Sequence, residues 1–188
     1  MDTVQRAIRE RRSVTRVADT PVERARLNAL IEAALWAPNH KLTLPWRFVV
    51  VSGDARDALG DAHADARRRL DPGLTPEGAL AQRALTRRAP HIIVCAVRHP
   101  GDDPVARRED RDAVSAGIQN MLLAAHADGL GAVWRTGPFV DEPEVRAHLG
   151  CGPGEEIVGF VYVGLPDGDA PPAPPRPATA DVAEWRDG

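Results

Sequence analysis

The chain has 188 residues, a formal net charge of −3 and an isoelectric point near 6.1. This balance does not favour nucleic acid or an anionic membrane as a partner, so any basic site must be local. The two cysteines lie far apart, which argues against a disulfide framework and a zinc or other metal site. No apolar run is long enough for a membrane span, and the amino terminus has charges where a signal peptide needs an apolar run, so we expect a cytoplasmic protein.

The first third of the chain is predicted to hold two helices. Apolar spacing indicates a helix over residues 3–11, which ends where a group of arginines begins. A second helix is predicted to start at a capping box, with Thr20 as N-cap, Pro21 in the first turn and Glu23 three residues after the cap. Pro38 should end this helix.

Apolar runs predict four strands, at residues 47–52, 91–97, 131–137 and 156–166. The run at 47–52 indicates a strand covered on both faces. A charged loop is expected up to Glu109. Helical periodicity predicts further helices at 54–70 and 111–128, and a short one closed by Gly150. Pro and Gly predict a break at 71–78, and a further helix is expected after it, up to about residue 88.

The end of the chain changes character, because five prolines fall among residues 171–177. Such a segment cannot continue as a helix or a central strand. We therefore expect one domain over residues 1–170 and an extended arm over residues 171–188. Val182 and Trp185 near the end of this arm need a surface to cover, which a second chain could supply.

The sequence RRS at residues 11–13 is the first candidate binding site. Arg11, Arg12 and Ser13 offer guanidinium groups, a hydroxyl and backbone N–H groups, which together suit a phosphomonoester. An alternative interpretation is that these cations complement the dipole of the preceding helix. This stretch taken alone favours the helix-dipole interpretation.

Two further segments place indoles and polar groups together. The first, residues 35–46, carries Trp36 and His40 after a helix end, and the second, residues 131–139, carries Trp134, Arg135 and Thr136 at a strand end. Strand ends commonly bind small molecules. Each segment also has an ordinary interpretation as core, cap or solvated surface.

Helices that separate strands suggest a parallel α/β sheet. However, no G-x-G-x-x-G motif follows a strand, and the only lysine, Lys41, lies in a loop rather than in a phosphate-binding loop. A phosphate-bearing ligand must therefore be held in another way.

Five segments taken in order resemble the nitroreductase family of flavin mononucleotide (FMN) oxidoreductases, and its small members most closely. They are RRS, APNHK with PWRFVVV, AP before the second strand, GAVWRTG after an apolar helix, and IVGFVYVGLP with a Pro-rich tail ending in VAEW. The resemblance implies an α+β fold, with a mixed sheet flanked by helices and C-terminal arms exchanged in a homodimer.

The resemblance also implies roles for the candidate residues. Arg11, Arg12 and Ser13 would bind the flavin phosphate, Trp36 and His40 would reach the flavin of the partner subunit, and Trp134, Arg135 and Thr136 would lie beside the isoalloxazine ring. His126, Asp128 and Gly129 would contact NADH or NADPH, although helix capping is an alternative role for them. Family members often carry a basic residue where this chain has Thr15, so the group that faces the flavin pyrimidine is left open, as is the role of Arg176.

The implied activity is hydride transfer from NAD(P)H to flavin N5, and then to a nitroaromatic, a quinone or a similar acceptor by a ping-pong mechanism. No protein side chain is expected to act as the catalytic group, because the flavin carries the chemistry. One alternative is a non-catalytic protein that stores, senses or delivers flavin. Another is a dehalogenating or ring-fragmenting flavin enzyme, for which residues 71–88 would have to form a substrate lid.

Overall fold

The computed structural model describes residues 2–186 and is built around a four-stranded sheet. Its strands are β1 (Trp46–Ser52), β2 (His91–Arg98), β3 (Gly131–Arg135) and β4 (Glu155–Gly164), in the order β1-β2-β4-β3. All three pairings are antiparallel, so the α+β class is confirmed, whereas the mixed pairing expected of the sheet is not seen among the described residues. The helical connection from β1 to β2 leaves and re-enters the sheet at the same end, since Ser52 at the end of β1 pairs with His91 at the start of β2.

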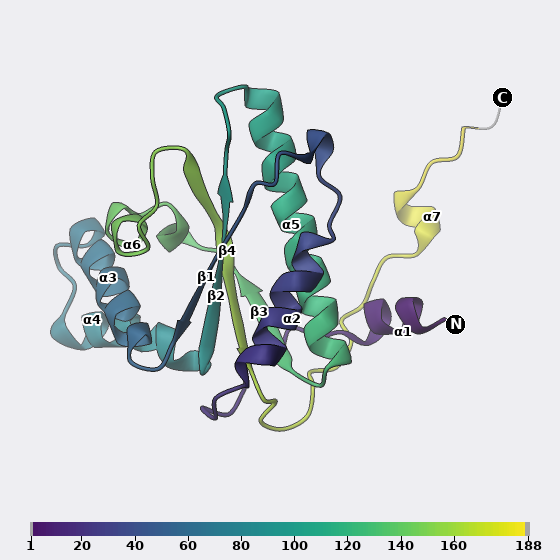
Figure 1. Cartoon of the computed structure of the whole chain (residues 1–188). Helices are drawn as coiled ribbons and strands as arrows, with labels where there is room; N and C mark the ends of the chain where they lie inside the picture. Colours follow the sequence, from purple (N-terminus) through teal and green to yellow (C-terminus); the bar gives the residue numbers. More distant parts are fainter. Residues whose placement is uncertain (1, 187–188) are drawn as a thin grey trace.

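Helices cover both faces of the sheet (Figure 1). One face packs on α2 (Arg24–Leu35) and the long α5 (Pro104–Ala127), and the other packs on α3 (Ala55–Leu70) and α6 (Pro143–His148). Helix α4 (Pro76–Arg83) packs against α3. Strand β2 is buried along its whole length except at Arg98, which explains its unbroken apolar run. Three 3-10 turns complete the fold, at η1 (His40–Leu42), η2 (Ala84–Arg88) and η3 (Pro138–Val140).

Two short helices lie outside this layered body. The first, α1 (Thr3–Glu10), is capped by the Asp2 side chain, which accepts from Gln5 N at 2.8 Å, and has no buried residue. The second, α7 (Thr179–Val182), belongs to the Pro-rich tail, which stays exposed and runs on the same side of the molecule as α1 (Figure 1). No helix within residues 2–186 has both the length and the apolar content to cross a bilayer.

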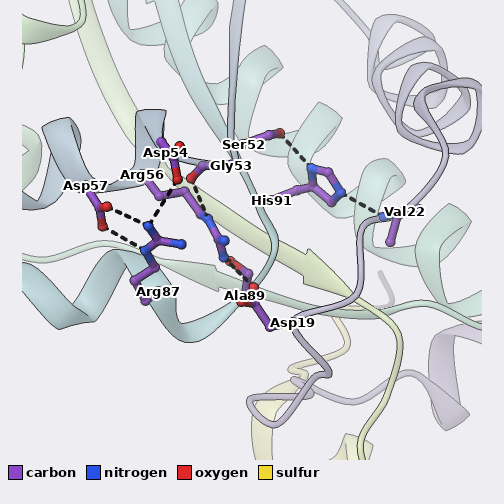
Figure 2. A network of polar contacts seen from close by, with 10 residues as sticks. All are labelled: Asp19, Val22, Ser52, Gly53, Asp54, Arg56, Asp57, Arg87, Ala89 and His91. Atoms are coloured by element: carbon purple, nitrogen blue, oxygen red, sulfur yellow. Dashed lines mark hydrogen bonds and ion pairs between the residues drawn. The ribbon is translucent and has the colours of Figure 1, made fainter.

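The predicted capping box at Thr20 is wrong, because α2 begins only at Arg24. The backbone N–H of Val22 donates instead to His91 Nε2 at 2.8 Å, and the segment before it is held by an ion pair between Asp19 and Arg56 at 2.7 Å (Figure 2). These tertiary bonds hold residues 19–22 outside the helix, which overrides the local helix-start signal.

Two other helix boundaries also differ from expectation. The charged loop expected up to Glu109 is wrong, since α5 starts at Pro104 with Asp103 as N-cap, whose side chain accepts from Val105 N at 3.1 Å. Likewise, α4 begins inside the predicted break, where Thr75 Oγ1 accepts from Gly78 N at 3.1 Å. In both cases a cap residue followed by Pro starts the helix.

The prediction that the first strand is covered on both faces is also wrong. Strand β1 lies at the edge of the sheet and only Val51 in it is fully buried, while Val50 is 41% exposed. An apolar run reports that a strand can be buried, but it does not say where the strand lies in the sheet.

Beyond β3, the opposite edge of the sheet is bordered by the chain that follows α1. Val14 N donates to the carbonyl oxygen of Ala132 at 3.0 Å, and Val17 forms a bridge with Pro166. This pairing fixes Ser13 beside the first half of β3. The end of α1 and the length of β3 therefore lie along one edge of the molecule.

Candidate functional site

The arginine cluster at the end of α1 opens onto a cavity of about 240 Å³. Arg11, Arg12 and Ser13 line one side of this cavity, and Pro171, Pro172, Pro174 and Arg176 of the tail line the other. Three guanidinium groups therefore converge from two distant parts of the chain. The sequence left the role of Arg176 open, and the structure brings it to this cluster.

Arg11 has a buried donor atom that a bound anion could satisfy. Its Nη1 atom is buried and has no hydrogen-bond partner among the described residues. Burial, followed by the charges of Arg12 and then Arg176, lowers the pKa of Arg11 from its ordinary value. Mutual repulsion of three cations in one cavity is relieved when an anion binds, and a phosphate offers enough oxygens to meet them.

Arg12 combines the two interpretations of the sequence. Its Nη1 donates to the carbonyl oxygen of Arg9 at 2.7 Å and to that of Arg11 at 2.9 Å. One side of this guanidinium thus caps the carboxyl end of α1, as the helix-dipole interpretation requires. Arg12 nevertheless still lines the cavity with Arg11 and Arg176.

The second part of the site is the end of β3, where Trp134 and Arg135 point to opposite faces of the sheet. Trp134 packs with the core beneath α2 and α5. Its indole lies against Gly159, where an added Cβ would come within 2.2 Å of Trp134 Nε1. The guanidinium of Arg135 lies on the other face, 5.8 Å from the centre of the Tyr162 ring. The alternation of a strand therefore separates two residues that the sequence places side by side.

The chain after Arg135 is exposed and has an unusual backbone. Gly137 has φ +149° and ψ −178°, a conformation that only glycine adopts readily, and nothing lies within 4 Å of where its Cβ would be. Thr136 and Gly137 can thus present backbone N–H groups to a flat ligand at close range.

A second cavity, of about 150 Å³, lies behind this segment on the face that carries α3 and α6. Its polar lining includes Arg88 of η2, Arg135 and His63. His63 is almost fully buried, with 3% of its surface exposed. The His63 ring stacks on Phe139 with 4.5 Å between ring centres, and neither of its nitrogens has a partner among the described residues. Burial, with a smaller effect from His148, lowers the pKa of His63 to about 4, so this imidazole is neutral at pH 7.

Trp36 and His40 do not line either of these cavities within one chain. Trp36 ends α2 and is 81% exposed, and His40 begins the exposed turn η1. Thr43 Oγ1 anchors this turn to the buried carboxylate of Asp110 at 2.5 Å. The turn therefore projects its side chains outward from a fixed base.

His126, Asp128 and Gly129 lie at the amino end of β3, whereas Thr136 lies beyond its carboxyl end. Asp128 accepts from Arg26 Nε at 2.7 Å and is the C-cap of α5, and Gly129 follows it with φ +70°. In this structure the group forms a helix cap, and the strand separates it from the segment at Thr136 and Gly137.

Arg88 and His63 were not among the residues that the sequence singled out. Neither belongs to a motif, and each reaches the cavity only because η2 and α3 pack on the sheet face behind β3. The one sequence signal for Arg88 is its position directly before Ala89 and Pro90.

The chain is similar to known proteins over most of its length. The family model described as Nitroreductase family matches residues 8–165. The chain is 31% identical to Escherichia coli (strain K12) YdjA over 88% of this chain and 89% of that protein. It is 32% identical to Bacillus subtilis (strain 168) YfhC over 93% and 89% of the two chains. Both relatives are provisionally named NAD(P)H nitroreductases.

Two solved structures extend the likeness over the whole fold. A nitroreductase-like family protein from Bacillus cereus has a TM-score of 0.86 and 31% identity, covering 100% of this chain and 98% of its own. A provisionally named nitroreductase from Desulfovibrio desulfuricans, solved in complex with FMN, has a TM-score of 0.76 and 29% identity, covering 99% and 98%. The sequence match, the α+β fold and the arginine cluster lead to one conclusion: the chain belongs to the nitroreductase family.

Proposed function

We propose that this protein is an FMN-dependent NAD(P)H oxidoreductase that reduces nitroaromatics, quinones or similar small acceptors by a ping-pong mechanism. The observation that carries the proposal is the buried, unpartnered Nη1 of Arg11 in a cavity that it shares with Arg12 and Arg176. The names of the relatives support NAD(P)H as the reductant, and the Desulfovibrio desulfuricans structure supports FMN as the cofactor.

The residues along the edge at β3 fit FMN. Arg11, Arg12, Ser13 and Arg176 would hold the phosphate through charge-assisted hydrogen bonds. Val14 pairs with Ala132, and Thr136 lies four residues further along. At about 3.3 Å per strand residue the distance is about 13 Å, which leaves room for a ribityl chain and the near side of a flavin ring.

When bound, FMN supplies the two-electron chemistry, and the protein supplies position and polarity. Thr136 and Gly137 would offer backbone N–H groups to the ring at close range, because no side chain of Gly137 intervenes. The Arg135 side chain would lie on the side of this segment away from Trp134, because the two side chains are on opposite faces of the sheet. Nothing in this arrangement needs an acid–base pair from the protein.

We further propose that two copies share the flavin sites, and that residues 1–170 form the domain while residues 171–188 form an arm that reaches the partner. Trp36 and His40 would then contact the flavin of the other copy. Large apolar side chains that are exposed in the single chain support an interface of this kind, among them Ile8, Leu35, Leu42 and Trp185.

The test is to purify the protein, record flavin absorbance, and follow NADH and NADPH oxidation with a nitroaromatic and with a quinone. The proposal expects a yellow protein, bleaching by at least one coenzyme, and parallel double-reciprocal plots as in ping-pong kinetics. A yellow protein that neither coenzyme bleaches would support the flavin-storage or sensor alternative instead. A colourless protein that takes up no added FMN would reject both.

A further inference from the structure

We propose that Thr43 is a positioning residue for the proposed reaction. By joining Asn39 to the buried Asp110, its hydroxyl holds the turn over residues 39–44 in the conformation that carries His40 toward the flavin of a second copy. The inference rests on the proposed function, which gives His40 a flavin contact but does not say what fixes this residue in place.

The backbone of the turn is the first argument. Lys41, Leu42 and Leu44 have φ values of 57°, 52° and 51°. These values lie in the left-handed region, which residues with a side chain seldom adopt. Strain of this kind persists only where the surrounding structure imposes it, and it gathers at sites that need a fixed geometry. Other contacts must therefore hold this turn.

Burial of apolar side chains does not supply those contacts. Leu42 and Leu44 are 76% and 68% exposed, and Lys41 is exposed as well. The six residues of the turn divide into four exposed ones and two partly buried ones, which are Asn39 and Thr43. The polar side chains of these two residues are therefore the candidates for holding the turn.

Asn39 and Thr43 form a short chain of hydrogen bonds that leads into the core. Asn39 Oδ1 accepts from the backbone N–H of Leu44 at 2.8 Å, and its Nδ2 donates to Thr43 Oγ1 at 2.9 Å. The Thr43 hydroxyl donates in turn to Asp110 Oδ1 at 2.5 Å. One hydroxyl thus acts as acceptor and donor at once, and it links both ends of the turn to helix α5.

Asp110 gives this chain of bonds a fixed base. Its side chain is buried on α5, and its second carboxylate oxygen lies 3.4 Å from His99 Nδ1. His99 is itself held, because its backbone N–H donates to the carbonyl oxygen of Gly154 at 2.9 Å. The Asp110 carboxylate therefore lies between two partners, and turning away from Thr43 would leave a buried charge poorly paired.

The network has a consequence for His40. This residue lies between Asn39 and Lys41, so its backbone is inside the held turn, while its side chain is exposed. A side chain on a fixed backbone loses less conformational freedom on binding than one on a mobile loop. Loosening the turn at Thr43 should therefore weaken the contact between His40 and the flavin, although Thr43 itself makes no such contact.

The first experiment measures how firmly the turn is held. Thr43→Val keeps the shape of the side chain without the hydroxyl, and Thr43→Ser restores the hydroxyl. The only lysine of the chain, Lys41, lies in the turn, so a protease that cuts only after lysine reports the opening of this segment. We expect Thr43→Val to be cut about tenfold faster than the wild type and Thr43→Ser at nearly the wild-type rate, because cleavage follows the population of the open turn. Equal rates for Thr43→Val and the wild type would overturn the proposal.

Thr75→Val is the matched control for general loss of stability. Thr75 Oγ1 also accepts a hydrogen bond, from Gly78 N at 3.1 Å, but it does so at the start of α4. We expect no faster cut at Lys41 in this variant, and an acceleration equal to that of Thr43→Val would overturn the proposal. If Thr43→Val does not fold, Asn39→Ala breaks the same network from its other end and carries the same expectations.

The second experiment tests the link to the flavin by a double-mutant cycle on FMN affinity. His40→Ala and Thr43→Val should each weaken FMN binding about fivefold, and the double variant should bind no more weakly than His40→Ala, because Thr43 acts through His40. Unchanged affinity in Thr43→Val, or independent effects that multiply to about 25-fold, would overturn the proposal. A wild type that binds no FMN would reject the proposed function, and this failure is distinguishable because the cut at Lys41 is measured without FMN.

Discussion

The backbone N–H of Val22 donates to Nε2 of His91 across 2.8 Å, joining the entry of α2 to the start of β2 (Figure 2). Because Nε2 accepts this bond, the ring proton is on Nδ1, which faces Ser52 Oγ at 2.6 Å. In this tautomer His91 cannot take a proton from Ser52 through Nδ1. The pair therefore serves to fasten two elements and is not a nucleophile with its base.

Acid should weaken the fold through its neutral histidines. Burial, followed by the charge of Arg56, lowers the pKa of His91, and His63 titrates at about 4. Both pKa shifts are downward from the ordinary value of about 6.5, so the stabilisation is complete above pH 6.5 and is lost as the pH falls toward the folded-state pKa. His63 alone should cost about 2 kcal/mol of unfolding free energy at pH 5.

Urea unfolding at pH 7.5 and pH 5 measures this loss. In the variant His63→Phe, which keeps a ring against Phe139, the difference between the two pH values should shrink by about the same 2 kcal/mol. An unchanged difference would show that His63 is protonated as easily in the folded protein as in the unfolded chain.

Phosphate binding should depend on the arginine cluster. Replacing Arg11 and Arg12 with Ala removes charge-assisted hydrogen bonds and should weaken FMN binding by at least about 2 kcal/mol. Arg176→Ala should weaken it as well, because this residue lines the same cavity. Arg16→Ala is the control, since the one ion pair that Arg16 forms within residues 2–186 is with exposed Asp167. Titration of flavin fluorescence gives the four affinities, and retention of FMN by the Arg11 and Arg12 variant would leave the cluster as a helix cap.

Removal of residues 171–188 tests the arm. We expect the truncated protein to dissociate at concentrations where the full chain is dimeric, because Val182 and Trp185 are 71% and 80% exposed in the single chain. Sedimentation of both forms in the presence of FMN measures the change. A truncated chain that stays dimeric and keeps its flavin would exclude an exchanged arm.

Gly159→Ala should destabilise the fold by about 1–3 kcal/mol, the usual cost of overpacking. The new Cβ would lie 2.2 Å from Trp134 Nε1 and 2.9 Å from the carbonyl oxygen of Arg135. Gly152→Ala is the matched control, because nothing lies within 4 Å of its Cβ position. Thermal unfolding compares the two. If Gly159→Ala also distorts the segment after Arg135, the bound flavin should show a shifted absorbance spectrum.

Much of the fold could be predicted because apolar runs and helical periodicity reflect burial directly. Strand β2 and helix α3 lie within about a residue of their expected positions. The error at Thr20 has a different cause, since the backbone donor at Val22 is taken by His91, 69 residues away in sequence. Local capping signals cannot report such a partner.

The site divides in the same way. RRS could be recognised because three adjacent residues line one cavity at one helix end. Arg176 reaches them from the tail, and Arg88 and His63 reach their cavity from separate elements. Only the packed structure brings these groups together. For Trp134 and Arg135 the reverse holds: the two residues are neighbours in sequence, but their side chains lie on different faces of the sheet.

The position of Arg176 connects the exposed tail to the cavity lined by Arg11 and Arg12. If FMN binds in the cavity that the tail lines with Arg11 and Arg12, proteases should cut the exposed tail at a rate that depends on how much FMN is bound. In limited digestion, cleavage within residues 171–186 should then become slower as FMN is added.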